Sequence, residues 1–322
     1  MVKITFFDWK IDEHQKLSKL IILSTIMSAI IPKVTKLSER VIRVLGCNPG
    51  PFTLQGTNTY LVGTGDNRVL IDTGEKNNQE YINTLKDVLS SSQIKLSNII
   101  ITHWHPDHVG GLLSVLDLPN IHPGCKVFKF KNDKKDVIND QISYEYLRDE
   151  QSIEVDDKTT LRVLFTPGHT DDHAALLLDE EKSVFAGDCV LGEGSVIFED
   201  LSDYLKSLEI IASFNPVKIY PGHGPEVYNP KEKINDLIGR RMNRERQIME
   251  CIRSSDSQGT TISEIVSIIF KDKPKELHPV AAFTITHHLQ KLLKEQKVET
   301  DGLADQAHYW IKGVRNQCLK GL

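Results

Sequence analysis

Apolar and polar positions along the chain predict a series of short strands between residues 41 and 220. Three apolar segments, 41–45, 59–62 and 68–71, are separated by turn residues, and a Gly-Thr-Gly-Asp-Asn turn between the last two predicts a hairpin. Residues 79–92 instead carry apolar side chains at helical spacing, and the apolar segment 98–102 predicts a buried strand. This order of elements predicts a mixed α/β domain.

Three later strands each end near a side chain that can bind a metal ion. The segments and the residues that follow them are 161–165 with His169, 183–186 with Asp188, and 217–220 with His223. A glycine beside each of these residues permits a tight turn and a close approach of the backbone to an ion. If the strands lie side by side, their ends meet at one rim, where loops hold functional groups over a rigid sheet.

The strand predicted at 98–102 leads directly into a dense group of potential ligands. His103, His105, Asp107 and His108 lie within six positions. His103 and His105 fall on the same side of an extended chain, because side chains alternate with a period of two, and the next two can turn towards a second ion. Burying these imidazoles without a metal would be costly, because they would repel one another or lose hydrogen bonds. The cluster therefore predicts a metal site.

Composition places the chain among ordinary globular proteins. Its 322 residues are enough for a large domain and a smaller one, and its 39% apolar and 26% charged residues exclude disordered, collagen-like and disulfide-scaffold classes. Five scattered cysteines without a C-x-x-C pair indicate a reducing compartment. The net charge of −5 is unevenly divided, because residues 231–322 carry 16 Lys and Arg against 12 Asp and Glu.

Residues 1–38 are interpreted as an N-terminal appendage or leader. The apolar stretch 20–31 is too short to cross a bilayer, so we expect no stable membrane association. Acidic residues precede that stretch and residues 1–39 contain no Arg, which is unlike a secretory or mitochondrial presequence. Met27 is an alternative start that would leave a short leader free of acidic residues.

Residues 235–322 have the pattern of a second unit that follows a catalytic domain at 39–234. Helices are predicted at 235–253, from a capping-box-like start at 261–264, and at 281–297, and the segment 298–312 is predicted to form a short wing. This order predicts an α-rich, winged-helix-like domain. The alternative is a helical cap that covers one side of the catalytic domain.

The seven potential ligands, in this order and spacing, resemble the pattern of the metallo-β-lactamase superfamily over about residues 40–230. The resemblance implies a four-layer αββα sandwich of two mixed sheets, with the site at one edge. It also implies two metal ions. His103, His105 and His169 would hold one ion, Asp107, His108 and His223 would hold the other, and Asp188 would bridge them.

A narrower resemblance is to the β-lactamase-like protein 2 group, which comprises animal endoribonucleases of the metallo-β-lactamase fold. It runs from about residue 34 nearly to the C-terminus and rests on the segments 43–51, 53–60, 166–173 and 198–201. It implies cleavage of single-stranded RNA, a winged-helix-like tail and a location in the mitochondrial matrix. The cytoplasm is the alternative location.

The ligand types predict the chemistry of the centre. Nitrogen and carboxylate ligands without thiolate suit two Zn²⁺ ions, although Mn²⁺ and Fe²⁺ accept the same set. Two ions would lower the pKa of a shared water from about 15.7 towards neutrality and hold it as a hydroxide in line with a phosphodiester or carbonyl. This metal-bound hydroxide is the expected nucleophile, and Asp107 is a candidate proton acceptor as well as a ligand.

Other side chains are candidates for supporting the site. Asp72 ends a predicted strand and could hydrogen-bond the distal nitrogen of a ligand histidine, or could cap its own loop instead. His173 could orient substrate or support the site, or could be a satisfied histidine elsewhere in the core or on the surface. Cys189 is expected to face away from Asp188 and to pack in the core.

Three functions are consistent with these features. The first is a binuclear zinc endoribonuclease acting on single-stranded RNA, and the second is a thioester hydrolase that resembles glyoxalase II. The third is a non-catalytic RNA-binding protein with structural metals. Seven C-terminal cations could contact RNA phosphates but suit exposed helix positions equally well: Arg240, Arg241, Arg244, Arg246, Lys291, Lys294 and Lys297. No oligomeric state is specified by the sequence.

Overall fold

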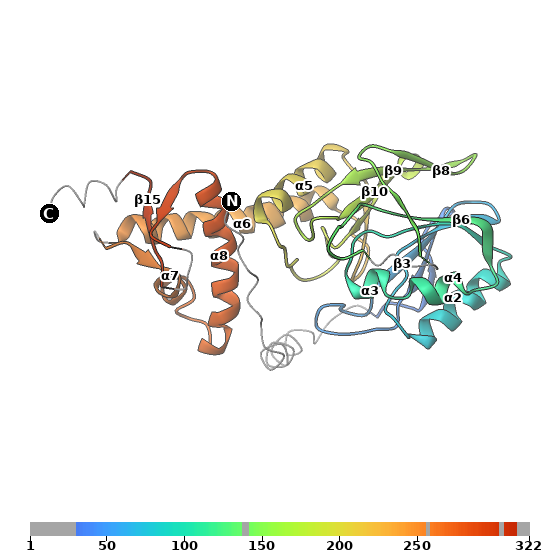
Figure 1. Ribbon diagram of the computed structural model, residues 1–322, viewed down its shortest axis with the longest axis horizontal. Helices are drawn as coiled ribbons and strands as arrows, with labels where there is room; N and C mark the ends of the chain where they lie inside the picture. Colours follow the sequence, from blue (N-terminus) through green and yellow to red (C-terminus); the bar gives the residue numbers. More distant parts are fainter. Residues whose placement is uncertain (1–29, 137–141, 256–257, 303–305, 314–322) are drawn as a thin grey trace.

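Two β-sheets packed face to face form the larger part of the molecule in the computed structural model, which describes residues 30–136, 142–255, 258–302 and 306–313 (Figure 1). The first sheet has seven strands in sequential order: β1 (Val34–Lys36), β2 (Val41–Leu45), β3 (Asn58–Val62), β4 (Asn67–Ile71), β5 (Lys95–Ile100), β6 (Ile121–Lys129) and β7 (Tyr144–Tyr146). The second has five, in the order β12 (Lys218–Pro221), β11 (Ser183–Gly187), β10 (Ala174–Leu178), β9 (Thr159–Phe165) and β8 (Ser152–Asp156).

Helices cover the outer face of each sheet. The first sheet is covered by α2 (Gln79–Ser91) and α4 (Leu112–Leu116), and short α3 (Pro106–Val109) lies just before α4 (Figure 1). The second is covered by α5 (Leu201–Ser213) and the first part of α6 (Pro230–Ser254). A one-turn 3₁₀ helix, η1 (Asp179–Glu181), joins β10 to β11.

Three apolar cores lie between the four layers. Along β4, Leu70 packs towards α2, whereas Val69 and Ile71 pack into the core between the sheets. Along β9, Val163 faces that central core and Leu164 faces α5. Both faces of these strands are buried, which explains why their sequences are almost continuously apolar. The αββα sandwich that the resemblance implied is confirmed.

The strands that carry the predicted ligands belong to both sheets. β5 lies in the first sheet, whereas β9, β11 and β12 lie in the second. The three later strands thus share one sheet, whereas the strand that precedes His103 lies in the other, so the four strands do not all lie side by side. Their ends meet instead across one edge of the sandwich, because the two sheets stack face to face. The predicted strand 98–102 is also placed too late, since β5 begins at Lys95 and ends at Ile100.

A second, smaller unit follows the sandwich. It contains the last part of α6, then β13 (Thr260–Thr261), α7 (Ile262–Ile269), η2 (Lys275–Leu277), α8 (His278–Lys294), β14 (Val298–Thr300) and β15 (His308–Ile311). The three strands pair in the order β13-β15-β14, and the predicted capping box is present, with Thr261 and Glu264 bonded reciprocally. The predicted winged-helix-like domain is confirmed, although α8 ends three residues before the predicted 297.

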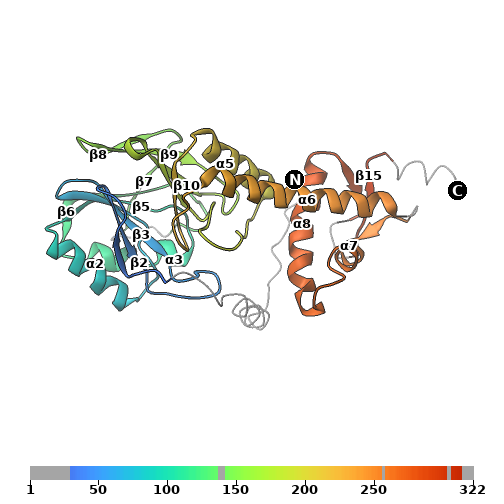
Figure 2. The same cartoon turned by 180° about the vertical axis from the view of Figure 1, so that it is seen from behind.

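Helix α6 joins the two units without a break (Figure 2). Ile234 and Leu237 pack in the core of the sandwich, whereas Ile248 and Ile252 pack in the core of the C-terminal domain. The predicted boundary between residues 234 and 235 thus falls inside one helix that contributes to both cores.

The N-terminal appendage predicted at 1–38 is described only from residue 30. Val34–Lys36 form β1, an edge strand that pairs antiparallel with β2, so this part of the segment belongs to the sandwich. Most of the apolar stretch at 20–31, together with Met27, lies outside the described residues, and the mitochondrial location stays a prediction. Within the described ranges, no helix has the length and apolar character needed to cross a membrane.

Candidate metal centre

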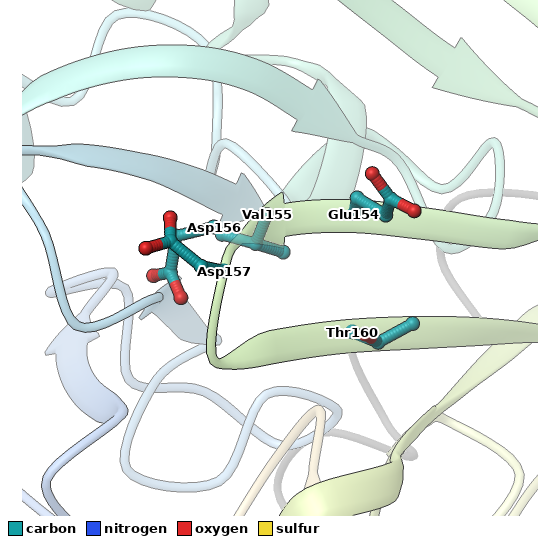
Figure 3. Close-up of a pocket in the computed structure, with 5 residues that line it drawn as sticks. All are labelled: Glu154, Val155, Asp156, Asp157 and Thr160. Atoms are coloured by element: carbon teal, nitrogen blue, oxygen red, sulfur yellow. The ribbon is translucent and has the colours of Figure 1, made fainter.

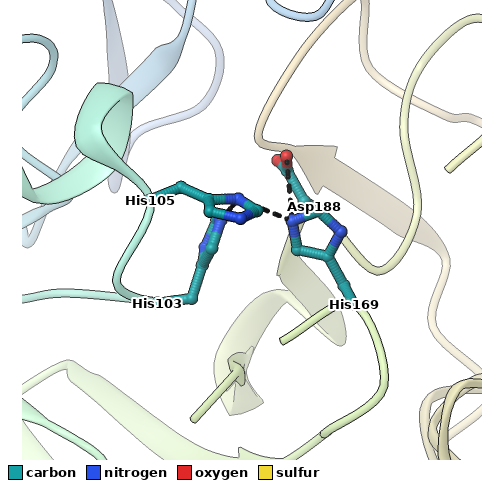
Figure 4. Close-up of side chains that lie close together, drawn as sticks. All are labelled: His103, His105, His169 and Asp188. Carbon is teal, nitrogen blue, oxygen red and sulfur yellow. Dashed lines mark hydrogen bonds and ion pairs between the residues drawn. The ribbon is translucent and has the colours of Figure 1, made fainter. Parts of the chain in front are cut away.

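Four of the predicted ligands form one group at the edge of the sandwich (Figure 4). His105 Nδ1 lies 2.9 Å from His103 Nε2 and 3.0 Å from His169 Nε2, and Asp188 Oδ2 lies 3.6 Å from the same atom of His169. His103 and His105 follow β5, His169 follows β9, and Asp188 follows β11. The nitrogens of the three imidazoles converge on one space, as ligands of a single ion would.

The other three predicted ligands form an adjoining group. Asp107 Oδ2 lies 3.2 Å from Nε2 of His108 and 3.2 Å from Nε2 of His223, and the two histidine nitrogens are 3.3 Å apart. Asp188 lies between the groups, because its Oδ1 is 3.5 Å from His108 Nε2 and its Oδ2 is 3.3 Å from His223 Nε2. The structure thus brings all seven predicted residues together.

Local turns place ligands of the second group. Pro106 occupies the first turn of α3, where its fixed φ favours a helix, and this short helix carries Asp107 and His108. The His108 ring lies beside that of His103, with centroids 4.1 Å apart. On the opposite side, a Cβ at Gly222 would lie 2.2 Å from Asp188 Oδ1, so a larger residue there would displace the carboxylate. The expected role of glycine beside a ligand is therefore found at this position.

Asp72 contacts the distal nitrogen of one ligand histidine. His108 Nδ1 donates to Asp72 Oδ2 over 2.8 Å, and the Thr102 backbone N–H donates to Asp72 Oδ1 over 2.8 Å. This bond directs His108 Nε2 towards Asp107 and His223, as in other carboxylate–histidine–metal arrangements. Of the two interpretations of Asp72, the structure favours the one that supports the site.

His173 is buried and contacts the backbone beside Asp188. Its Nε2 accepts a hydrogen bond from the Asp188 N–H over 3.1 Å, and its Nδ1 therefore donates to Thr166 Oγ1 over 2.8 Å. It lies next to the cluster and fixes the loop that presents Asp188. Cys189 is buried in the core behind that loop, which confirms its predicted packing role.

Three contacts of the site were not predicted. His169 Nδ1 donates to the carbonyl oxygen of Ile197 over 2.6 Å, His103 Nδ1 lies 3.0 Å from Thr102 Oγ1, and Thr57 Oγ1 donates to Asp107 Oδ2 over 2.9 Å. A backbone carbonyl leaves no signal in the sequence. The two threonines could have been suspected only from their positions, because Thr57 shortly precedes a predicted strand and Thr102 directly precedes His103.

Burial and neighbouring side chains shift the pKa values of the histidines in opposite directions in the two ligand groups. Burial and the neighbouring imidazoles lower the pKa of His103 well below its ordinary value and that of His105 to about 3. Burial also lowers the pKa of His223, but Asp188 and Asp107 outweigh it and raise the pKa to about 9. The first group therefore presents neutral nitrogens at pH 7, whereas an ion must displace a proton from the second.

The donor set fits metal ions. Two nitrogens on a tetrahedral Zn²⁺, each about 2.05 Å from the ion, are about 3.3 Å apart. The separations between imidazole nitrogens within the two groups, 2.9 to 3.3 Å, are close to this value. In addition, Asp188 Oδ1 is buried without a hydrogen-bond partner among the described residues. This cluster of His and Asp residues could hold two ions.

A hollow elsewhere on the sandwich lacks these features. It lies at the turn between β8 and β9 and is lined by Glu154, Val155, Asp156, Asp157 and Thr160 (Figure 3). Asp156 Oδ2 accepts a hydrogen bond from the Thr64 N–H, so this acid braces a neighbouring turn. The hollow contains carboxylates but no histidine, and nothing there resembles the seven-residue centre.

Comparisons with known proteins agree with the fold and the domain order. The chain matches the model of the Metallo-beta-lactamase superfamily over residues 52–223 and that of the Beta-lactamase associated winged helix domain over residues 261–307. A Beta-lactamase-like protein 2 homolog of Drosophila melanogaster is 43% identical, with 87% of this chain and 97% of that protein covered. The homolog of Caenorhabditis elegans is 42% identical, with 88% and 93% covered. The narrower resemblance is thereby confirmed.

Solved structures support the same fold. A metallo-beta-lactamase family protein from Thermus thermophilus has a TM-score of 0.63 at 23% identity and covers 88% of this chain and 100% of its own. A beta-lactamase domain protein from Burkholderia ambifaria has a TM-score of 0.71 at 17% identity, with 88% and 95% covered. Because the family model matches residues 52–223, more than half of the chain, the chain belongs to the metallo-beta-lactamase superfamily, and this segment contains all seven residues of the centre.

Proposed function

We propose that this superfamily hydrolase is a binuclear zinc endoribonuclease that cleaves single-stranded RNA. The observation that carries the hydrolytic part is the pair of adjoining ligand groups with Asp188 between them. The ligands would be divided as the resemblance implied, three residues to each ion. Zinc held there would polarise the scissile phosphate and supply a nucleophilic water of lowered pKa.

The chain's own residues prepare this site in three ways. Asp72 accepts a hydrogen bond from Nδ1 of His108, and the Ile197 carbonyl accepts one from Nδ1 of His169. Each bond keeps the imidazole proton on Nδ1 and leaves Nε2 free to bind a metal ion. His173 holds the backbone at Asp188. Burial raises the pKa of Asp107, but His108 and His223 outweigh it and lower that pKa, which supports the ligand role over that of proton acceptor.

The RNA part of the proposal is supported by the resemblance to the endoribonuclease group and by two side chains beside the centre. Trp104 is partly exposed and lies edge to face with His105, with ring centroids 4.5 Å apart. The exposed Lys135 places its Nζ 4.1 Å from the centroid of the Trp104 ring. An aromatic surface with a cation suits an unpaired base and its phosphate, since every base can stack.

A thioester hydrolase is the second candidate, and one relative favours it. A protein of Aspergillus fumigatus named atrochrysone carboxyl ACP thioesterase is 35% identical, with 89% of this chain and 91% of that protein covered. A thioester carbonyl could be attacked at the same centre, because both reactions need a nucleophilic water and a polarised oxygen.

One assay distinguishes the candidates. The zinc-loaded full chain is incubated with labelled single-stranded RNA, duplex RNA, single-stranded DNA and a glutathione thioester. We expect cleavage of single-stranded RNA, loss of that cleavage in Asp107→Ala, and no change in Asp236→Asn, whose carboxylate pairs with Arg240 on the surface of α6. Hydrolysis of the thioester alone would reverse the ranking, and RNA binding without cleavage would favour the non-catalytic alternative.

A further inference from the structure

The loop at residues 195–200 lies between the metal centre and the C-terminal domain. On the side of the centre, the Ile197 carbonyl accepts the hydrogen bond from His169 Nδ1. The backbone N–H groups of Glu199 and Asp200 both donate to the carbonyl of Gly168, over 2.7 and 3.0 Å. The loop is thus bonded directly to the turn that carries His169.

On its other side, the same loop is held by Arg241 of α6. Arg241 Nη2 donates to Ser195 Oγ over 2.6 Å and to the Val196 carbonyl over 3.2 Å. Its guanidinium carbon lies 4.9 Å from the centroid of the Phe198 ring. These three contacts bracket Ile197, the residue whose carbonyl orients His169.

The environment of Arg241 is unusual for a cation. Its contacts with this loop are to a hydroxyl, a carbonyl and an aromatic ring, and burial lowers its pKa. Its Nε is buried without a hydrogen-bond partner among the described residues. Arg241 is half-buried, and because removing part of a cation from water against neutral groups is unfavourable, general stability explains this arrangement less well than holding the loop does.

Helix α8 of the C-terminal domain contacts the loop as well. The ring of His287 lies edge to face with Phe198, with centroids 5.5 Å apart. Lys294 forms an ion pair with Asp200, whose carboxylate also caps α5 by accepting from the Ser202 and Asp203 N–H groups. The loop is therefore held between the centre on one side and two helices, α6 and α8, on the other.

We propose that Arg241 is a positioning residue for the metal centre. It acts through the backbone of residues 195–197, which places the Ile197 carbonyl, and thereby sets the orientation of His169 and the affinity of the first ligand group for its ion. This inference rests on the proposed two-metal centre but not on RNA as substrate. It also gives the C-terminal domain a part in assembling the site.

The expected effect is selective and moderate. Removing a group that is hydrogen-bonded to a metal-bound histidine lowers metal affinity about 10- to 100-fold. Arg241 acts one step further away, so we expect about a tenfold loss in Arg241→Ala, at the lower end of that range. Among the described residues, the loop is hydrogen-bonded to His169 and not to the side chains of Asp107, His108 or His223, so the ion held by these three residues should keep nearly its parental affinity.

The test measures metal binding in the full chain. Zinc is titrated against a competing chelator in the parent, Arg241→Ala, Arg241→Lys and Arg253→Ala, and the absorption spectrum of the cobalt-substituted proteins is recorded. We expect Arg241→Ala to lower the affinity for one of the two ions and to change the cobalt spectrum. The effect of Arg241→Lys should be intermediate. Arg253, an exposed arginine later on the same helix, is the matched control and should leave both readouts unchanged.

Other outcomes separate this inference from the proposed function. Binding of both ions by Arg241→Ala with parental affinity and spectrum would overturn the inference alone. A parent that binds no zinc would overturn the two-metal centre and the inference with it. If Arg241→Ala does not fold, Phe198→Leu replaces it, because this change removes the ring beneath the guanidinium, and the same weakening of one ion is expected.

Discussion

Replacing Asp72 by Asn is expected to weaken selectively the binding of the ion that Asp107, His108 and His223 would hold. Asp72 has a φ of +61°, a left-handed conformation that Asn tolerates well, so the backbone should be kept. If the Asn oxygen keeps the bond from the Thr102 N–H, its amide faces His108 Nδ1, and two donors then oppose each other. His108 must lose this bond or move its proton to Nε2, the atom that faces Asp107.

The size of this effect follows from the role of the bond. Loss of a partner that orients a metal-binding histidine typically costs about 10- to 100-fold in metal affinity, or about 1.4 to 2.8 kcal/mol. Calorimetric titration of the metal-free protein with zinc measures it, with Asp236→Asn as the control. Two ions bound by Asp72→Asn with the parental affinities would refute the assignment of Asp72 as the group that orients His108.

Two further predictions concern stability. Burial and the nearby Arg241 lower the pKa of His288 to about 3. Below about pH 6.5 the unfolded chain therefore takes up a proton at this position that the folded protein does not. The free energy of unfolding falls as the pH drops from there towards 3, by about 1.4 kcal/mol per pH unit. Between pH 7 and 5, the free energy of unfolding of His288→Leu should therefore fall by about 2 kcal/mol less than that of the parent, as measured by urea unfolding. Equal falls in the two proteins would contradict this. A Cβ at Gly168, where φ is +130°, would lie 2.2 Å from the Tyr204 backbone nitrogen, so Gly168→Ala should cost about 3 kcal/mol. Gly239→Ala, where no atom lies within 4 Å, should not destabilise the chain, and equal unfolding midpoints for the two variants would contradict the steric argument.

The ligands were predictable because each follows a strand whose apolar pattern is strong. A strand fixes the position of the residue after it, so His169, Asp188 and His223 could be identified from local sequence alone. The pairing of strands into two sheets could not, because buried strands with both faces apolar have no polar side that reveals which face meets which layer. That step came from the resemblance to the superfamily.

The groups that orient the ligands were harder to predict for a different reason. Asp72 and His173 were suspected from their side chains, and both contact the site. Ile197 acts through its backbone carbonyl, a group that every residue has, so its identity gives no signal. Only the approach of a distant loop, held in part by α6, gives this carbonyl its role.

The C-terminal cations show how burial changes the meaning of a charge. Lys291 is 7% exposed and pairs with Glu245, Lys294 pairs with Asp200, and Arg241 is occupied by the loop before α5. The remaining cations of the predicted set also have partners: Arg240 with Asp236, Arg244 with Gln247 and Phe270, Arg246 with Asn243, and Lys297 with Glu245 and Glu295. A phosphate would have to compete with these contacts, which lowers the net free energy gained by binding it at this surface.

For an RNA substrate, the exposed Lys135 beside Trp104 has the advantage that its cation lies on an aromatic ring next to the centre itself. If RNA is the substrate, as we propose, recognition is therefore expected at Trp104 and Lys135 beside the metal centre, and the C-terminal domain is expected to act mainly through its contacts with the 195–200 loop.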